Sequence, residues 1–356
     1  MIKKLLSAVL SVSLLLLLTS CDILKRDGNE EGTEPRGVTY YEYFATVSSV
    51  QSFGGDSEEN FAAVTEKVQT MLSEYNNLYD IYREYSGINN LKTVNDNAGV
   101  APVEVDARII DLLKFGLEAY ELTNGEVNIM MGSVLRLWHD AREGDGEGNH
   151  VLPTDDQLVL ADTHTKIDSL VIDEAAGTVY ISDPEASIDV GAIAKGYATE
   201  RIAEALIADT SLSTGGYALN IGGNIRLIGD KCGKNFKIGI TNPDKSSDEP
   251  YVAMVAVSDT SVVTSGDYER YFSVDGVRYH HVIDKDTLKP SVYFHSVTVI
   301  TEDSALADAL TTALFSMHIN DGHALVESMA GVEAMWVGTN DTLVKSSGFP
   351  EIDMAK

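Results

Sequence analysis

Two oxygen-bearing side chains lie four residues apart in the segment SALADALTTALF, residues 304–315. Residues with this spacing share one face of a helix, so Asp308 and Thr312 would point toward the same ligand. A carboxylate, a hydroxyl, backbone carbonyls and substrate phosphates together form a shell that magnesium accepts. The segment therefore indicates a magnesium site, with a carboxylate that simply faces solvent as the alternative.

The segment EASIDVGAIAKGYATERIAEAL, residues 185–206, begins like a buried strand, turns through small residues and continues as a helix. The N-terminus of a helix presents free N–H groups and partial positive charge, so it favours an anion such as a phosphate. Lys195 lies at the entrance of this helix. The glycines match neither the dinucleotide-binding fingerprint nor the nucleoside-triphosphate loop. Tight packing of the strand on the helix is the alternative interpretation of this corner.

The segment TSGDYERYFSVDGVRYHHVID ends in paired histidines, His280 and His281, which lead into a strand with Ile283. Neighbouring residues of a strand point to opposite faces, so we expect at most one histidine to enter a site. The pair is a poor zinc site, because neither an HExxH motif nor a cysteine cluster accompanies it.

Three tyrosines recur in the segment NLYDIYREYSG, at Tyr79, Tyr82 and Tyr85. Aromatic rings at this position could stack on a planar ligand. The alternative is that they are core tyrosines whose hydroxyls are satisfied within the protein.

Hydrophobic periodicity predicts the elements that must position these residues. Apolar residues recur at helical spacing from Phe61 to Tyr79, which predicts a helix that ends near Asp80. Other segments with helical features are 106–122, the stretch opened by Ser133 and closed by Gly144, the residues after Ile193, and 304–317.

Residues 37–50 are rich in β-branched and aromatic side chains, which is typical of a strand. From Lys166 onward the chain consists mainly of short alternating segments separated by turn residues, the pattern of an antiparallel sheet. Helices thus gather toward the N-terminus and strands toward the C-terminus. We therefore predict an α+β fold in one compact catalytic unit.

The N-terminus has the layout of a secretory signal: two lysines, an apolar run and small residues that lead directly to Cys21. The apolar run is too short to span a bilayer comfortably. The ending LTSC resembles a bacterial lipobox, which makes residues 1–20 a signal peptide and Cys21 the lipidated first residue. An ordinary signal peptide that happens to contain a cysteine is the alternative. Residues 21–37 are polar and predict a flexible tether, so the folded domain is expected over 38–350.

The composition restricts the partners that the protein can have. The 356 residues carry a formal net charge of −29, and 44% of them are hydrophobic, enough for a substantial core. Such a surface repels nucleic acid and anionic lipid. We therefore expect no nucleic-acid partner, and membrane attachment only through the lipid anchor. An anionic small molecule would bind only where backbone amides, a lysine or a metal reverse the local field.

Five motifs in a fixed order make a more specific signal than any one of them. The order IDVGAIAKGYA, LNIGGNIRLIG, TSGDYERY, HHVID and ALADALTTALF, behind a lipobox, resembles the ApbE family of flavin transferases, from about Val38 to Val344. The resemblance implies a T-fold-like α+β unit. It also implies an enzyme that binds FAD with Mg²⁺, transfers the FMN portion to a threonine or serine hydroxyl of a target protein, and releases AMP.

The resemblance also assigns roles to residues of this chain. His281 matches the histidine that acts as the base, a role suited to an imidazole that titrates near neutral pH. Tyr82 matches the aromatic residue that packs against the isoalloxazine ring. The other assignments are FAD contacts at Asp189, Lys195 and Ile283, and metal ligands at Ala192 (through its carbonyl), Asp308 and Thr312.

Two positions depart from the family pattern. Phe44, in the segment YFAT, stands where the family commonly has methionine. The segment Glu126, Val127, Asn128 occupies an FAD-binding stretch in which Asn128 replaces the usual aspartate. Both departures concern the recognition of adenosine and leave the diphosphate chemistry untouched.

The implied acceptor is a second protein. The family modifies a hydroxyl in the pattern Ser/Thr-Gly-Ala-Ser/Thr, and the nearest approach in this chain, Thr214-Gly215-Gly216-Tyr217, fails at its last two positions. An extracytoplasmic FMN-binding domain, such as a subunit of an Rnf- or Nqr-type redox complex, would face the same space as an enzyme anchored to the outer face of the inner membrane. Two rival functions use the same site: a magnesium-dependent FAD pyrophosphatase and a non-catalytic flavin-binding lipoprotein.

Overall fold

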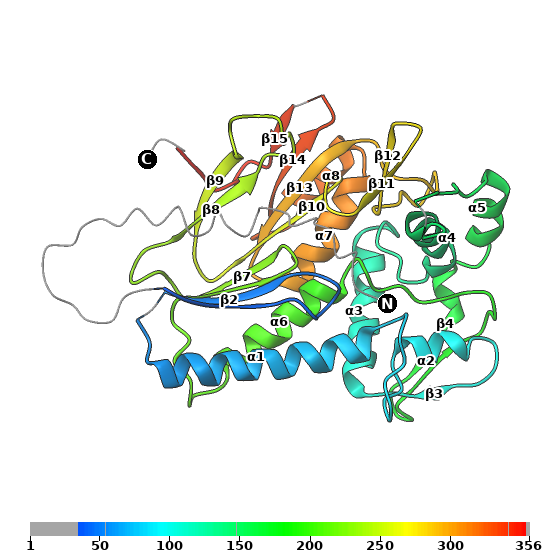
Figure 1. Cartoon of the computed structure of the whole chain (residues 1–356), viewed down its shortest axis with the longest axis horizontal. Helices are drawn as coiled ribbons and strands as arrows, with labels where there is room; N and C mark the ends of the chain where they lie inside the picture. Colours follow the sequence, from blue (N-terminus) through cyan, green and yellow to red (C-terminus); the bar gives the residue numbers. More distant parts are fainter. Residues whose placement is uncertain (1–34, 54, 147, 341, 354–356) are drawn as a thin grey trace, which may run out of the picture.

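The computed structural model describes residues 35–353 except 54, 147 and 341 (Figure 1). Cys21, the predicted signal peptide and nearly all of the predicted tether lie outside the described residues. Within the described part, no helix is long and apolar enough to cross a membrane.

An eight-stranded sheet forms the centre of the fold, and each pair of neighbouring strands in it is antiparallel. Its strand order brings the N-terminal hairpin against strands that come much later in the chain. In spatial order the strands are β1 (Arg36–Tyr40), β2 (Ser48–Ser52), β6 (Tyr217–Ile221), β7 (Asn224–Ile228), β10 (Ser261–Gly266), β13 (Phe294–Thr301), β14 (Glu333–Gly338) and β15 (Leu343–Lys345).

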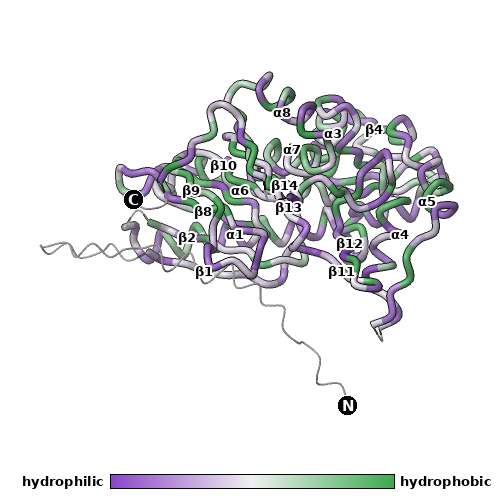
Figure 2. The backbone as a smooth tube through the Cα atoms, turned by 90° about the horizontal axis from the view of Figure 1, so that it is seen from above, coloured by the Kyte–Doolittle hydropathy of each residue, from purple (hydrophilic) through white to green (hydrophobic). Residues whose placement is uncertain are grey.

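Two helices pack on this sheet and against each other (Figure 1): α6 (Ala194–Ile207) and α7 (Ser304–Ser316). Helix α7 is apolar almost all round because it lies between two cores. Ala305, Ala309 and Ala313 belong to the core that includes α1 and α6, while Leu310 and Leu314 pack with β13 and β14. Hydrophobic residues gather along the central strands and helices (Figure 2). A carboxylate on such a helix is therefore an exception that needs a reason.

The remaining helices and small sheets surround this centre. Helix α1 (Glu58–Tyr79) is capped by Ser57, whose side chain accepts a hydrogen bond from the Asn60 backbone N–H. The other helices are α2 (Leu91–Asp96), α3 (Ala107–Leu122), α4 (Gly132–Glu143), α5 (Asp155–Asp162), the short η3 (Ile167–Ser169) and α8 (Ile319–Glu327). The other strands are β3 (Val103–Glu104), β4 (Leu170–Asp173), β5 (Thr178–Ile181), β8 (Phe236–Thr241), β9 (Tyr251–Val257), β11 (Tyr271–Val274), β12 (Val277–His280) and β16 (Glu351–Ile352).

The structure confirms the predicted α+β class and corrects three local predictions. Residues 37–50 form a hairpin of β1 and β2 rather than one strand, because the chain turns at Phe44 and Ala45, which both have positive φ. Helix α4 begins at Gly132, before Ser133, and Ser133 donates its hydroxyl to the Ala161 carbonyl instead of capping the helix.

The third correction concerns the paired histidines. Strand β12 ends at His280, so His281 lies in the connection that follows it, where Ile283 forms an isolated bridge with Pro290. Because His281 lies outside the strand, the side chains of His280 and His281 need not point to opposite faces.

Candidate active site

The corner before α6 brings backbone and side chains of α6 and α7 together. Helix α6 follows Ile193, which offers no side-chain cap. The Ala194 N–H donates to the Val190 carbonyl and the Gly196 N–H to Asp308, so of the first N–H groups of the helix only that of Lys195 has no acceptor among the described residues. A Cβ on Gly196 would collide with the Ser304 carbonyl oxygen and with Asp308 Cβ. Close packing is thus one reason for the small residues here. Beside it, Asp189 accepts a hydrogen bond from the Gly191 backbone N–H at 2.8 Å.

Asp308 points from α7 into this corner and does not face solvent. Its side chain is 5% exposed, it accepts a hydrogen bond from the Gly196 backbone N–H at 2.8 Å, and Lys195 Nζ lies 3.5 Å from its Oδ1. The solvent-facing alternative is therefore wrong. A carboxylate at the N-terminus of α6 is also favoured by the partial positive charge there.

The oxygen atoms around Asp308 fit a hard cation. Ala192, Asp308 and Thr312 line one cavity, and no described N–H or O–H donates to the Ala192 carbonyl. Thr312 donates its hydroxyl only weakly, to the Asp308 carbonyl at 3.4 Å. Carboxylate, hydroxyl and carbonyl oxygens are the donors that Mg²⁺ prefers. The described residues contain no cluster of three or more His, Cys, Asp or Glu side chains that could hold a metal, so this mixed oxygen set is the candidate they offer.

The cavity has a volume of about 230 Å³ and collects residues from segments far apart in the chain. Its walls come from α4, the corner before α6, the turn between β6 and β7, the end of β10, and the connection after β12. Of the predicted site residues, those that line it are Tyr82, Glu126, Val127, Asn128, Asp189, Ala192, Lys195, His281, Ile283, Asp308 and Thr312.

His280 and His281 are both among the residues that line the cavity. Their surroundings differ. His280 is buried, with Nε2 2.8 Å from the Ser291 carbonyl and Nδ1 accepting from the Val282 N–H. Within the described residues, the His281 ring nitrogens have no protein partner, and only its backbone N–H is used, by the Arg270 carbonyl at 3.1 Å. His281 is therefore the histidine that remains free to meet a substrate.

The environment of His281 lowers its pKa. The side chain is open to solvent, but the surrounding protein atoms still desolvate the charged form of the ring, which is the main cause of the lowered pKa. The positive charges of Arg270 and Lys195 lower the pKa further. The expectation that this imidazole titrates near neutral pH is therefore corrected. At neutral pH the ring is uncharged, which is the form that accepts a proton.

The three tyrosines divide between the two interpretations. Tyr79 is a core residue whose hydroxyl donates to the Arg108 carbonyl, and the Tyr85 hydroxyl donates to Asp80. Tyr82 lines the cavity, is 58% exposed and stacks on His139, with ring centroids 4.8 Å apart. Tyr82 is thus the tyrosine positioned to meet a planar ligand.

The two positions that depart from the family pattern have structural roles. Phe44 does not line the cavity; its positive φ of 52° turns the chain, and its N–H donates to Asn76 Oδ1 at 2.8 Å. The Asn128 side chain donates to the Thr165 carbonyl and accepts from the Met130 N–H. Burial raises the pKa of Glu126, although Lys285 lies 3.4 Å away and opposes the shift.

Sequence reasoning missed several cavity residues, among which three carry ionisable groups that could meet an anion: His139, Arg142 and Arg270. Arg270 belongs to the motif TSGDYERY, so its position in a recognised motif was an available signal. His139 and Arg142 lie on α4, where an ordinary amphipathic pattern gave no indication that one face meets a ligand.

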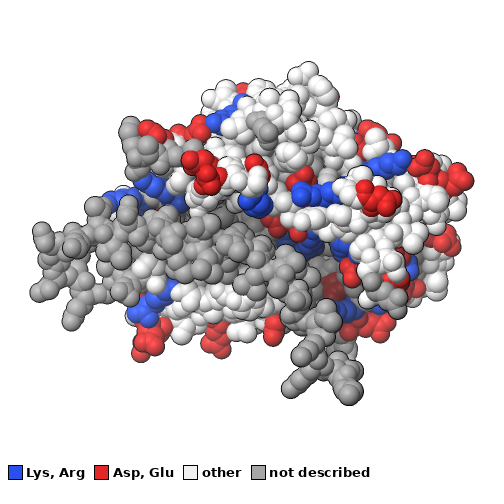
Figure 3. Space-filling view, turned by 45° about the horizontal axis from the view of Figure 1, so that its top comes forward, with Lys and Arg blue, Asp and Glu red and all other residues white. Residues whose placement is uncertain are grey.

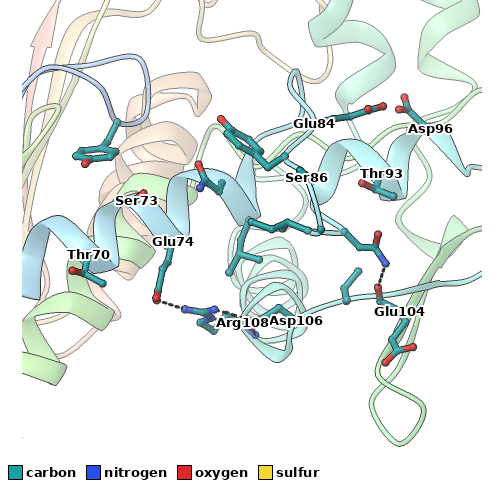
Figure 4. Close-up of a pocket in the computed structure, with 18 of the residues that line it drawn as sticks. Thr70, Ser73, Glu74, Glu84, Ser86, Thr93, Asp96, Glu104, Asp106 and Arg108 are labelled. Carbon is teal, nitrogen blue, oxygen red and sulfur yellow. Dashed lines mark hydrogen bonds and ion pairs between the residues drawn. The ribbon is translucent and has the colours of Figure 1, made fainter.

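A larger cavity, about 1410 Å³, lies along α1, α2 and β3 (Figure 4). Its arginine is paired with carboxylates that line the same cavity. Arg108 binds Glu74 at 2.5 Å and Asp106 at 2.8 Å, and Asn89 donates to the Glu104 carbonyl at 2.8 Å. No histidine or lysine lines it among the described residues, and its one arginine is already bound to carboxylates of the protein.

A helix entrance, an oxygen set for a cation and an unpaired histidine in one cavity are groups that phosphate-transferring enzymes combine. The ApbE family model matches residues 39–336, and the chain belongs to the ApbE family.

Named relatives and solved structures agree with this membership. The FAD:protein FMN transferase of Treponema pallidum is 32% identical over 320 residues, which cover 85% of this chain and 84% of that protein. The FAD:protein FMN transferase of Vibrio cholerae serotype O1 is 30% identical and covers 94% of each chain. The crystal structure of the ApbE protein from Thermotoga maritima superposes with a TM-score of 0.76 at 28% identity, covering 88% of this chain and 98% of that one.

Proposed function

We propose that this protein is an FAD:protein FMN transferase that uses magnesium and modifies a serine or threonine hydroxyl of another protein. One observation carries the proposal: the α6 corner, the oxygen set around Asp308 and the unpaired His281 line the same cavity. The names of the relatives support the same activity.

The chain's own residues supply positioning and proton transfer. At the entrance of α6, Lys195 holds the FAD diphosphate by its backbone N–H and by its positive charge. An imidazole nitrogen of His281 accepts the proton of the acceptor hydroxyl. The hydroxyl oxygen then forms a bond to the phosphorus of the FMN half, the P–O bond of the anhydride breaks, and AMP leaves with that electron pair.

Magnesium would be held by the Asp308 carboxylate, the Thr312 hydroxyl and the Ala192 carbonyl. When bound, the ion offsets the charge that develops on the diphosphate. Tyr82 presents an exposed ring for the isoalloxazine, and Ile283 provides an apolar wall beside it.

The acceptor is proposed to be an extracytoplasmic FMN-binding domain, such as a subunit of an Rnf- or Nqr-type redox complex. Acidic side chains are spread over the face shown in Figure 3, which disfavours nucleic acid. Lipidation of Cys21 would hold the enzyme at the outer face of the inner membrane, where confinement raises the effective concentration of acceptor. Cell fractionation tests the anchor: Cys21→Ser should move the protein from the membrane to the soluble fraction, and a variant that stays with the membrane would refute it.

Mass spectrometry of the acceptor tests the function. Purified protein is incubated with FAD and magnesium, with and without an FMN-binding domain that carries the Ser/Thr-Gly-Ala-Ser/Thr pattern. We expect covalent FMN on the domain and equimolar AMP. Rapid release of free FMN and AMP without acceptor would favour the pyrophosphatase, and FAD recovered intact in both arms would favour a flavin-binding protein.

A further inference from the structure

The cations that line the active-site cavity differ in their partners. Among the described residues these cations are Arg142, Lys195 and Arg270. Lys195 lies 3.5 Å from Asp308, and Arg142 lies 3.4 Å from Glu143. No described carboxylate lies within ion-pair distance of Arg270, which is therefore the cavity cation without an anion.

The hydrogen bonds of Arg270 use only part of its guanidinium. Nη2 donates to the Phe44 carbonyl at 3.3 Å and to the Ala45 carbonyl at 3.5 Å. In the described part of the chain, neither Nε nor Nη1 has an acceptor. A planar guanidinium can bind phosphate oxygens with its remaining N–H groups while Nη2 stays on the backbone.

The electrostatics of this position favour an incoming anion. Solvent still reaches Arg270, but enclosure by the cavity walls lowers its pKa, and the positive charge of Arg142 lowers it further. Arg270 is partly desolvated, and its strongest charged neighbour is the cation Arg142. Binding of an anion would therefore stabilise the charged guanidinium of Arg270. The anion that the proposed function brings to this cavity is the diphosphate of FAD.

Resting on that proposed function, we propose that Arg270 binds the diphosphate of FAD while its Nη2 group holds the backbone at residues 44–45. Phe44 and Ala45 have φ values of 52° and 50°, a conformation that is uncommon for residues other than glycine. Asn76 holds the same turn from its other side by accepting from the Phe44 N–H. Arg270 thus connects diphosphate binding to the turn that places Thr46 in the cavity wall.

Equilibrium binding of FAD, measured by flavin fluorescence in excess magnesium at several salt concentrations, tests this assignment. Arg270→Gln should weaken FAD binding about 10- to 100-fold, the loss of a charge-assisted hydrogen-bonded contact, and should make the affinity less sensitive to salt. Arg270→Lys should restore the salt sensitivity but only part of the affinity, because an ammonium lacks the planar fork.

Arg278→Gln is the matched control. Arg278 lies on β12 of the same hairpin, 3.6 Å from Asp267, outside the cavity, so its removal should leave the FAD affinity unchanged. If Arg270→Gln binds FAD within twofold of the wild-type protein, or loses affinity with an unaltered salt dependence, the diphosphate contact is refuted and the proposed function stands. If the wild-type protein itself does not bind FAD, the proposed function fails and this inference fails with it.

Discussion

Two cavities of this protein differ in how their arginines are satisfied. In the larger one, along α1, Arg108 binds the carboxylates of Glu74 and Asp106. In the smaller one, at the α6 corner, the acceptors that the described residues offer Arg270 are two backbone carbonyls at 3.3 and 3.5 Å. The arginine of the larger cavity is thus neutralised by carboxylates of the protein, whereas the arginine at the α6 corner has no carboxylate partner among the described residues.

This difference indicates where a ligand acts. A polar group that lines a cavity and has no protein partner there is a candidate contact for a ligand. Among the described residues the α6 cavity contains several such groups: Nε and Nη1 of Arg270, the ring nitrogens of His281 and the Ala192 carbonyl. Substitutions of single residues in the two cavities, or in the packing beneath the α6 cavity, test whether the α6 cavity binds the ligand and the cavity along α1 does not.

The largest effect is expected from Asp308→Asn. The amide keeps an acceptor for the Gly196 N–H but removes the charge that would hold magnesium, so transfer should fall by about a thousandfold or more. Single-turnover transfer to the acceptor domain measures this, and circular dichroism checks the fold. Transfer at the wild-type rate would refute the role of Asp308 as a magnesium ligand. The α6 cavity would then lack the metal site that separates it from the cavity along α1.

His281→Gln should reduce the transfer rate by about 10²- to 10⁴-fold, the usual contribution of a general base. Because the His281 ring has no partner among the described residues, the variant should unfold at the wild-type temperature and bind FAD normally. His280→Gln is the contrasting variant, since it breaks the contacts with Ser291 and Val282 and should lower stability. A His281→Gln protein that transfers at the normal rate would show that another group takes the proton.

Gly196→Ala tests the packing beneath the active-site cavity. The added Cβ would meet the Ser304 carbonyl oxygen and Asp308 Cβ, so we expect a loss of about 1–3 kcal/mol in the free energy of unfolding. Gly215→Ala is the control, because no atom lies within 4 Å of the Cβ that it would add. Urea denaturation compares the two, and equal stability of both variants would mean that α6 and α7 adjust freely.

The pH dependence of kcat/KM for FAD should show the lowered pKa of His281. Enclosure, Arg270 and Lys195 disfavour the protonated ring, so the neutral base persists below the ordinary pKa and activity is lost only as the pH falls through the lowered value. At pH 5.5 an unperturbed histidine would retain about a tenth of its neutral form, whereas we expect nearly full activity. Arg270→Gln should move this acid limb to higher pH, and an acid limb near pH 6.5 in the wild-type protein would contradict the assignment.

The ends of helices, and the residues that share one face of a helix, could be predicted from the sequence, because hydrophobic periodicity depends on local structure. Helix α1 ends at Tyr79 as expected, and Asp308 and Thr312 share a face of α7. The family motifs then indicated which of these residues meet in one cavity, as most of them do.

What could not be predicted depends on contacts between distant segments. The pairing of Arg270 with the carbonyls at residues 44–45 spans more than two hundred positions, and the lowered pKa of His281 arises from that same neighbourhood. The turn at Phe44 was interpreted as a strand because its residues have high β-propensity, which the tertiary contacts override.

The smallest effect is expected from Arg108→Gln in the cavity along α1. The Arg108 side chain is 38% exposed, and surface ion pairs contribute about 0–1 kcal/mol, so the free energy of unfolding should change by less than about 1 kcal/mol. FAD affinity and transfer should equal those of the wild-type protein, because the partners of Arg108 are carboxylates of the protein itself. Fluorescence titration beside Arg270→Gln makes the comparison direct. If Arg108→Gln weakens FAD binding as much as Arg270→Gln does, paired and unpaired arginines do not distinguish the two cavities, and the cavity along α1 takes part in ligand binding.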